Sequence, residues 1–319
     1  MPGQAPGQPE SSKLSPKLLP LDIRGARSQE KEEFLRDAGH GVSNGWCVEL
    51  GLNRVLVRQQ DLTRLGFRFG INGPHAARTM MLDDLRVLIA HTPSGATRQD
   101  YATAIVAENR LGKSTRKARE LSLRHLATLY GLDPANPLFR ALRRLWSSDA
   151  VAQPLLALTV ALARDPLLRA SQRLILSRPI GAPVPREDVE AFLAETFPDR
   201  FSPASLKSFA QNIAGTWTAA GFLLGHRRKI RSRPEVRAEV VALCLFIGYL
   251  EGRSGQRLFS SDWMTLLGGT PAELEALARS AAHRGLLVFM NAGGVKEVRF
   301  PGYLSAEEEQ IRQEATDVV

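Results

Sequence analysis

Apolar side chains recur at helical spacing along most of the chain from residue 72 onward. The first predicted helix starts at 72–74, ends before Pro93 and has one apolar face, made of Met80, Met81, Leu85, Leu88 and Ile89. The same periodicity predicts further helices over 97–111, 115–130, 137–147, 149–164, 166–177, 185–195, 203–221, 234–251, 261–267 and 271–284. The fold class is therefore expected to be mainly α.

Local signals support several of these helix ends. Thr97 and Asp100 have the spacing of a capping box, and Gly131 ends the helix over 115–130. Pro166 suits the first position of a helix, and Ser202 suits the cap of another. Apolar and polar positions alternate poorly over residues 46–69, so the sequence predicts no single type of secondary structure there.

Two similar units follow the proline-rich stretch 178–188. Each has helices followed by short β-rich segments, and in the second unit two such segments flank Asn291-Ala292-Gly293-Gly294, which predicts a hairpin. Helix, turn, helix and hairpin is the order of a winged helix. We expect a helical N-terminal domain with helix-turn-helix character and winged-helix-like units with short β-hairpin wings.

The expected boundaries follow composition as well as periodicity. They are a disordered basic arm at 1–28, a helical domain at 29–180, a winged-helix-like unit at 181–233, a C-terminal winged helix at 234–304 and an acidic tail at 305–319.

Charge narrows the class of partner. The 319 residues include 42 basic and 33 acidic side chains, a formal charge of +9, and without the tail 41 bases face 28 acids, or +13. The positive electrostatic field of such a charge favours binding of a polyanion, and the partner that we expect is double-stranded DNA. No apolar run is long enough to span a bilayer and the start lacks a signal peptide, so no membrane association and a cytoplasmic location are expected. Cys47 and Cys244, without a Cys/His cluster, predict buried thiols.

The densest basic segment is 226–233, with five bases and no acid. These bases are Arg227, Arg228, Lys229, Arg231 and Arg233, and they occupy the place of a wing, where they would neutralise phosphates without selecting sequence. Lys207 lies near the start of the preceding helix. On the predicted helix over 271–284, Arg279 and Arg284 lie on the polar face that could enter a major groove, although winged helices also hold proteins.

A second basic cluster surrounds Gly112. It comprises Arg110, Lys113, Ser114, Thr115, Arg116, Lys117 and Arg119, at a helix start where backbone NH groups favour an anion. Residues 107–114 also fit a relaxed phosphate-loop pattern, in which Lys113 and Ser114 would bind nucleotide and magnesium. The bulky Glu-Asn-Arg-Leu interior, the helical residues before it and the lack of alternating strands and helices argue against an NTPase.

Other catalytic or metal-binding patterns are weak. Ser43 has the spacing of a hydrolase nucleophile but follows a polar, helical segment, so a turn is the better interpretation. The six histidines are scattered and have no evident acid partner, and the four tryptophans lie beside apolar faces and suit a core. No catalytic residue, metal ligand or cofactor is predicted.

In the order of these segments, the chain resembles the BrxA family of BREX phage-defence systems. The similar parts are Arg78 and LDDLRVLI, residues 108–109 and 111–115 with a basic helix, residues 154–169, and Gly221-Phe222-Leu223-Leu224 before a basic wing. The N-terminal arm and the clear last winged helix depart from the family. The resemblance implies a non-catalytic DNA-binding accessory protein, with other subunits of a phage-defence complex as partners. The alternative is a protein-interaction adaptor that uses its winged helices as a scaffold.

Overall fold

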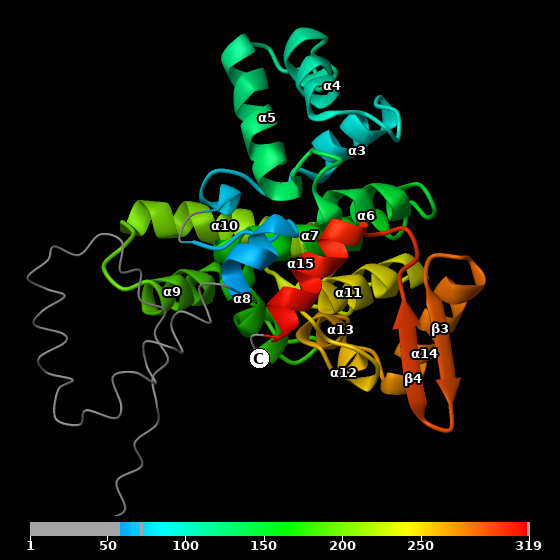
Figure 1. Ribbon diagram of the computed structural model, residues 1–319. Coiled ribbons are helices and arrows are strands. Elements are labelled where there is room, and N and C mark those ends of the chain that lie inside the picture. Colours follow the sequence, from blue (N-terminus) through cyan, green and yellow to red (C-terminus); the bar gives the residue numbers. More distant parts are fainter. Residues whose placement is uncertain (1–57, 71–72, 318–319) are drawn as a thin grey trace, which may run out of the picture. The chain divides into compact units, whose positions relative to one another are not determined.

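The computed structural model of the chain describes residues 58–70 and 73–317, and these are mainly helical (Figure 1). The helices are 58–64, η2 (Pro74–Ala76), α3 (Leu82–Ala90), α4 (Arg98–Ala102), the π-helical turn η3 (Thr103–Ala107), α5 (Arg116–Tyr130), α6 (Pro137–Trp146), α7 (Gln153–Arg164), α8 (Pro166–Ser177), α9 (Arg186–Thr196), α10 (Pro203–Ala219), α11 (Ala238–Leu250), α12 (Gln256–Phe259), α13 (Asp262–Leu266), α14 (Pro271–His283) and α15 (Ala306–Asp317). Two antiparallel hairpins pair β1 (Leu223–Leu224) with β2 (Ile230–Arg231) and β3 (Val288–Ala292) with β4 (Val295–Arg299). The expected arm at 1–28, Ser43, Trp46 and Cys47 lie outside the described residues.

Two helices form the centre of the core because they are apolar on every face. Residues 155–164 of α7 are buried without a break, and in α11 every residue except Tyr249 is buried. Helices of this kind need neighbours all round, and α7 packs against α5, α6, α8, α10 and α11. Trp146, Trp217 and Trp263 are buried in the same core, and so is Cys244, as their apolar surroundings in the sequence predicted.

Most predicted helix ends are confirmed. Thr97 and Asp100 form the capping box, Thr115 caps α5, Gly131 ends it with φ of 96°, and Ser202 caps α10. The expected hairpin at 291–294 is the turn of β3 and β4, whose two central glycines, Gly293 and Gly294, both have positive φ.

The helix expected to start at 72–74 is wrong over its first half. Residues 74–76 form one 3-10 turn, residues 78–81 are not helical, and α3 begins only at Leu82. The backbone of Met80 is occupied by side chains, because its NH donates to the Thr216 hydroxyl at 2.9 Å and its carbonyl accepts from the Tyr130 hydroxyl. Tertiary hydrogen bonds from α5 and α10 therefore replace the helical ones.

The first hairpin gains a third strand-like segment from residues 181–184. The NH of Gly181 donates to the Arg231 carbonyl, that of Arg231 donates to Ala182, and that of Val184 donates to Lys229, at 2.8–2.9 Å. This segment lies in the chain between α8 and α9, so the elements follow the order helix, strand, two helices and two strands.

The acidic segment at 305–319 contains the helix α15. Ile311 of this helix is buried, Glu308 pairs with Arg140, and Glu309 accepts from the Tyr249 hydroxyl at 2.8 Å. Part of its negative charge therefore neutralises bases of the body.

Candidate nucleic-acid interface

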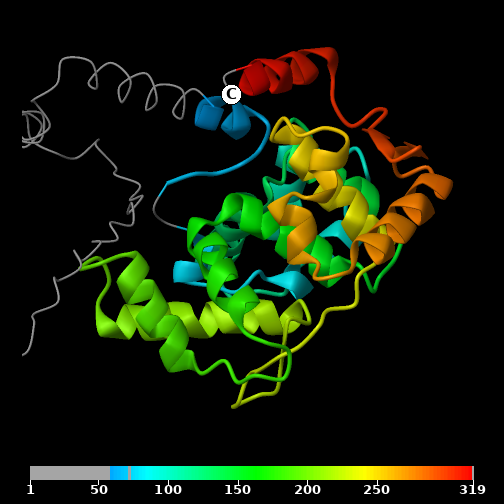
Figure 2. The same cartoon turned by 90° about the horizontal axis from the view of Figure 1, so that it is seen from below.

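The β1–β2 hairpin presents two arginines at its tip. In Figure 2 this loop, coloured yellow-green, projects beyond α10. Gly225 has φ of 95°, and a Cβ at this position would meet the carbonyl oxygen of Arg228, so the tight turn requires glycine. Arg227 and Arg228 are exposed, and neither has a hydrogen bond or ion pair within the described part of the chain. Their guanidinium groups are available for an anion.

The other bases of 226–233 are engaged. Arg233 pairs with Glu273 at 2.8 Å, and Lys229 donates to the Gly225 carbonyl at 2.7 Å. Arg231 is only 7% exposed. It donates to the carbonyls of Ile175 at 3.1 Å, Phe222 at 3.2 Å and Ser232, and burial lowers its pKa. The expectation that Arg231 lies on a polar surface loop is therefore wrong, since its alternating position in β2 turns it into the core.

Replacing Arg231 by Ala should lower the free energy of unfolding by about 2–3 kcal/mol, because it removes a buried guanidinium that donates to three backbone carbonyls. Arg228→Ala, three residues away and exposed, should change it by less than about 0.5 kcal/mol. Urea unfolding of both variants measures the difference. Equal stabilities would show that Arg231 is not a structural residue.

Helix α10 has a narrow exposed stripe of small and polar residues. Ala204, Lys207, Ser208 and Gln211 are exposed and follow helical spacing, whereas Phe209, Ile213 and Trp217 face the core. Lys207 has no hydrogen bond or ion pair among the residues whose structure is described. Small side chains allow a polymer to approach the helix closely, and Gln and Ser can donate or accept hydrogen bonds at base edges.

The fold brings the basic residues around Gly112 together, but most of their side chains are bonded to carboxylates or to a backbone carbonyl. Arg110 pairs with Glu108 at 2.7 Å, Lys113 with Asp84 at 2.8 Å and Arg116 with Glu120 at 2.9 Å. Arg119 donates to the Val106 carbonyl at 2.8 Å, and the Thr115 hydroxyl caps α5 by accepting from the NH of Ala118. Ser114 and Lys117 are exposed, and Lys117 has no ion pair within the described ranges.

The phosphate-loop alternative does not fit this geometry. A π-helical turn, η3, precedes residues 108–114, where a phosphate loop needs a strand. Asn109 has φ of 52° and its side chain accepts from the NH of Lys113 at 2.8 Å. The Lys113 ammonium is held by the Asp84 carboxylate of α3, so the group expected on the nucleotide already has a structural role.

The bases predicted on the last helix are also paired. Arg279 lies 3.7 Å from Glu275, and Arg284 pairs with the buried Glu239 at 2.5 Å. The α14 surface is therefore less positive than its sequence suggests.

The sequence analysis missed a set of bases beside α5. Arg78 and Arg124 are exposed. Burial of His125 lowers its pKa, and the positive charges of these two arginines lower it further. Lys117 and Arg124 are seven residues apart, which places them on one face of α5, and this spacing was a signal available in the sequence. Arg78 joins them only through tertiary structure.

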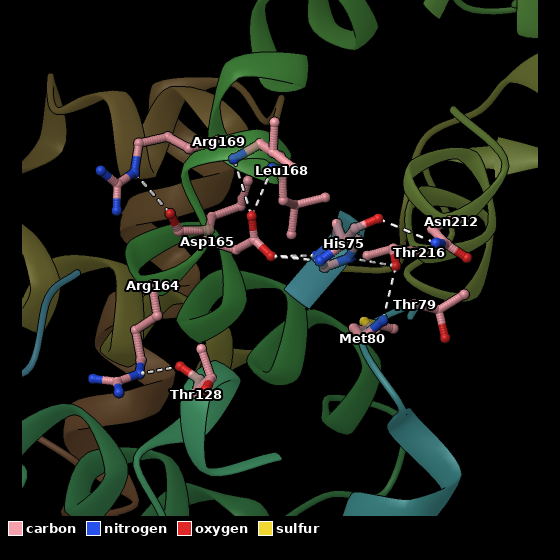
Figure 3. A network of polar contacts seen from close by, with 12 residues as sticks. His75, Thr79, Met80, Thr128, Arg164, Asp165, Leu168, Arg169, Asn212 and Thr216 are labelled. Carbon is pink, nitrogen blue, oxygen red and sulfur yellow. Dashed lines mark hydrogen bonds and ion pairs between the residues drawn. The ribbon is translucent and has the colours of Figure 1, made fainter. Parts of the chain in front are cut away.

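A buried hydroxyl, imidazole and carboxylate lie in a row between α10 and the start of α8 (Figure 3). His75 Nδ1 lies 2.8 Å from Asp165 Oδ2, and His75 Nε2 lies 2.8 Å from Thr216 Oγ1. The expectation that no histidine has an acid partner is therefore wrong. The sequence did not reveal this partner because Asp165 lies 90 residues from His75 in the chain. This is the order of groups in a hydrolytic triad, but all three side chains are buried from solvent.

The hydrogen bonds of His75, Asp165 and Thr216 instead link η2, the start of α8 and α10. Asp165 accepts from the His75 backbone at 2.9 Å and caps α8 by accepting from Leu167 and Leu168 at 3.0 and 3.2 Å. Burial would raise the pKa of Asp165, but the hydrogen bonds and the attraction to His75 outweigh it and hold this pKa below its ordinary value. When Nδ1 donates to Asp165, Nε2 accepts from the Thr216 hydroxyl and every donor has an acceptor.

Comparison with known proteins gives little further information. No protein-family model and no curated protein matches the chain. A crystal structure of SspB and a magnesium-ion-bound crystal structure of SspB are similar, each with 12% sequence identity and a TM-score of 0.47. They match over 81% and 80% of this chain and over 100% and 99% of their own. At this TM-score the similarity supports no conclusion about function. No helix in the described ranges is long and apolar enough to cross a bilayer.

Proposed function

We propose that this protein binds duplex DNA through phosphate contacts, without catalysis, as an accessory subunit of a BREX-like phage-defence assembly. The assembly is what the resemblance to the BrxA family implies, and the DNA contact rests on the surface chemistry. In this proposal α8–α10 and β1–β2 form a winged helix, with α10 as the helix that enters the groove. The third strand at 181–184 supports this, since a winged helix pairs such a strand with its hairpin.

One observation carries the proposal: the side chains of four of the predicted bases have neither a counter-ion nor a hydrogen bond in the part of the chain that the structure describes. They are Lys117, Lys207, Arg227 and Arg228, and all are exposed. The ion-paired bases of the same clusters would have to break contacts with carboxylates before they reached phosphate. Unpaired cations can neutralise phosphates directly and release condensed counter-ions, which gives affinity without sequence preference.

A second candidate function is protein binding by the last unit. Val288, Met290 and Val295 of the β3–β4 hairpin are 39%, 45% and 75% exposed. The register pairs Ala292 with Val295, so these side chains share one face of the hairpin. The same face also carries Glu297 and Arg299. Three exposed apolar side chains beside such a charged pair suit a protein partner better than phosphates, and this observation favours the adaptor role for this hairpin.

Replacing both Arg227 and Arg228 by Ala should weaken duplex binding on the order of tenfold near physiological salt, for all sequences alike. The slope of log affinity against log salt should become shallower by about 1.8, since each phosphate contact contributes roughly 0.9. The fold should be unchanged because both side chains are exposed. Fluorescence anisotropy at several salt concentrations measures the slope, and circular dichroism checks the fold.

The matched control is Arg64→Ala with Arg299→Ala, which removes the same charge from exposed arginines that have acid neighbours, Asp61 and Glu297. This control should keep the wild-type slope. A folded Arg227/Arg228 variant with an unchanged slope would place the DNA surface elsewhere. Partner binding that persists in this variant would support the adaptor.

A further inference from the structure

Two arginine side chains and one imidazole lie close together where η2 and α5 pack against each other. Arg78 follows η2, and Arg124 and His125 lie in adjacent positions of α5. The groups whose charge acts on His125 are Arg78 and Arg124, and no carboxylate is among them. Neither arginine side chain has a hydrogen bond or ion pair within residues 58–70 and 73–317. Like charges in such proximity repel one another unless an anion lies between or beside them.

The backbone that bears Arg78 is held firmly on both sides. The Asn212 side chain of α10 donates to the His75 carbonyl at 3.1 Å, and the Thr216 hydroxyl accepts from Met80. Tyr130, at the end of α5, donates to the Met80 carbonyl. Arg78 is therefore positioned by α10 and α5 together, and it is not on a freely moving loop.

The segment that carries Arg78 lies beside the exposed stripe of α10. A Cβ at Gly215 of α10 would lie 3.3 Å from the Thr79 side chain, so the segment 77–79 borders the stripe that carries Lys207 and Gln211. Residues 77–79 are themselves exposed. In Figure 1, α5 rises from the level of α10, and α5 packs against η2, the turn that precedes Arg78.

We propose that Arg78 and Arg124 form a phosphate-contact site beside α10, separate from the β1–β2 loop, and that His125 lies close enough to sense its occupancy. The site rests on the proposed DNA binding, since a duplex lying on α10 supplies the phosphate. Guanidinium groups with all donors unused match phosphate oxygens in geometry and charge.

His125 gives a local readout. Its buried Nε2 atom has no hydrogen-bond partner in the described structure, and burial and the two arginines hold its pKa below the ordinary value. Helix α5 also packs against η3 and α7. The cations at these contacts are Arg119 of α5, which donates to the Val106 carbonyl of η3, and Arg164 of α7, which donates to the Thr128 carbonyl of α5. A phosphate on Arg78 and Arg124 offsets their charge and raises the pKa of His125.

The experiment is an NMR pH titration of the full chain with labelled histidine, alone and with a short duplex, in wild type and in Arg78→Gln/Arg124→Gln. A His125→Asn variant assigns the resonance. We expect the duplex to raise the pKa of His125 in wild type only. The double variant should raise this pKa in the protein without DNA, bind the duplex on the order of tenfold more weakly and lower its salt slope by about 1.8.

The outcomes separate this site from the function on which it rests. Duplex binding with equal affinity and slope in both proteins, with no effect on His125, would overturn the site and leave DNA binding standing. No duplex binding by wild type would overturn both. Arg64→Gln/Arg299→Gln is the control, and a loss of affinity as large in this control as in the test variant would also reject the site.

Discussion

Asp165→Ala should lower the free energy of unfolding by about 3–5 kcal/mol, the largest effect on stability expected from one substitution among the residues discussed above. The buried carboxylate accepts from the NH and ring of His75 and from the NH groups of Leu167 and Leu168. Alanine leaves these donors without an acceptor and removes the cap of α8. Asp165→Asn keeps one oxygen but places an amide NH₂ against a donor, so we expect a smaller loss of about 2–3 kcal/mol.

Urea unfolding measures both changes, and the chain offers a matched control. Asp133 also precedes a proline and accepts from a backbone NH, that of Ala135 at 2.9 Å, but in an exposed turn. Asp133→Ala should cost less than about 1 kcal/mol. Gly73→Ala should destabilise the protein as well, because a Cβ there would collide with the Asp165 carboxylate. A loss no larger for Asp165→Ala than for Asp133→Ala would contradict the role assigned to the network.

The same carboxylate makes stability depend on pH. The pKa of Asp165 in the folded protein lies below its unfolded value of about 3.9. Its contribution is therefore complete above that unfolded value and is lost as the pH falls through the folded pKa. The stability difference between wild type and Asp165→Asn should shrink as the pH falls below about 3.9.

Reversing the four predicted bases whose side chains have no partner should have the largest effect on DNA binding. The variant carries Lys117→Glu, Lys207→Glu, Arg227→Glu and Arg228→Glu, which takes the formal charge from +9 to +1. Four lost phosphate contacts correspond to about a thousandfold loss of affinity near physiological salt and to a slope shallower by about 3.6. Anisotropy with a labelled duplex measures both values.

A charge-matched control separates local contacts from net charge. Its four reversed residues are Arg64, Arg257, Arg279 and Arg299, on the first described helix, α12, α14 and β4. This control also has a formal charge of +1 but should keep most of the affinity at moderate salt. If the control loses as much affinity as the test variant, either net charge alone or the last unit accounts for binding.

The helical elements and the hairpins could be predicted from sequence because their signals are local. Thr97 and Ser202 cap their helices as expected, and the glycines at 293–294 form the expected turn. The failure at 78–81 has a non-local cause. Met80 and Met81 have helical spacing, but hydrogen bonds from Thr216 and Tyr130 hold this segment outside the helix.

The candidate interface was predictable in part for the same reason. Base-rich segments are visible in sequence, and Arg227 and Arg228 are exposed as a polar loop should be. Whether a base is available depends on the acid that tertiary structure places beside it, such as Asp84 beside Lys113. Arg231 turns inward through the register of a two-residue strand, and Arg78 reaches Arg124 and His125 only through folding. Composition contains none of these facts.

The most direct test of the central proposal is the affinity of the full chain for duplex DNA against salt concentration, measured with several unrelated sequences. Phosphate binding by at least four unpaired cations predicts similar affinities for all sequences and a log–log slope of about −3.6 or steeper. A slope near zero, or no binding even at low salt, would contradict it.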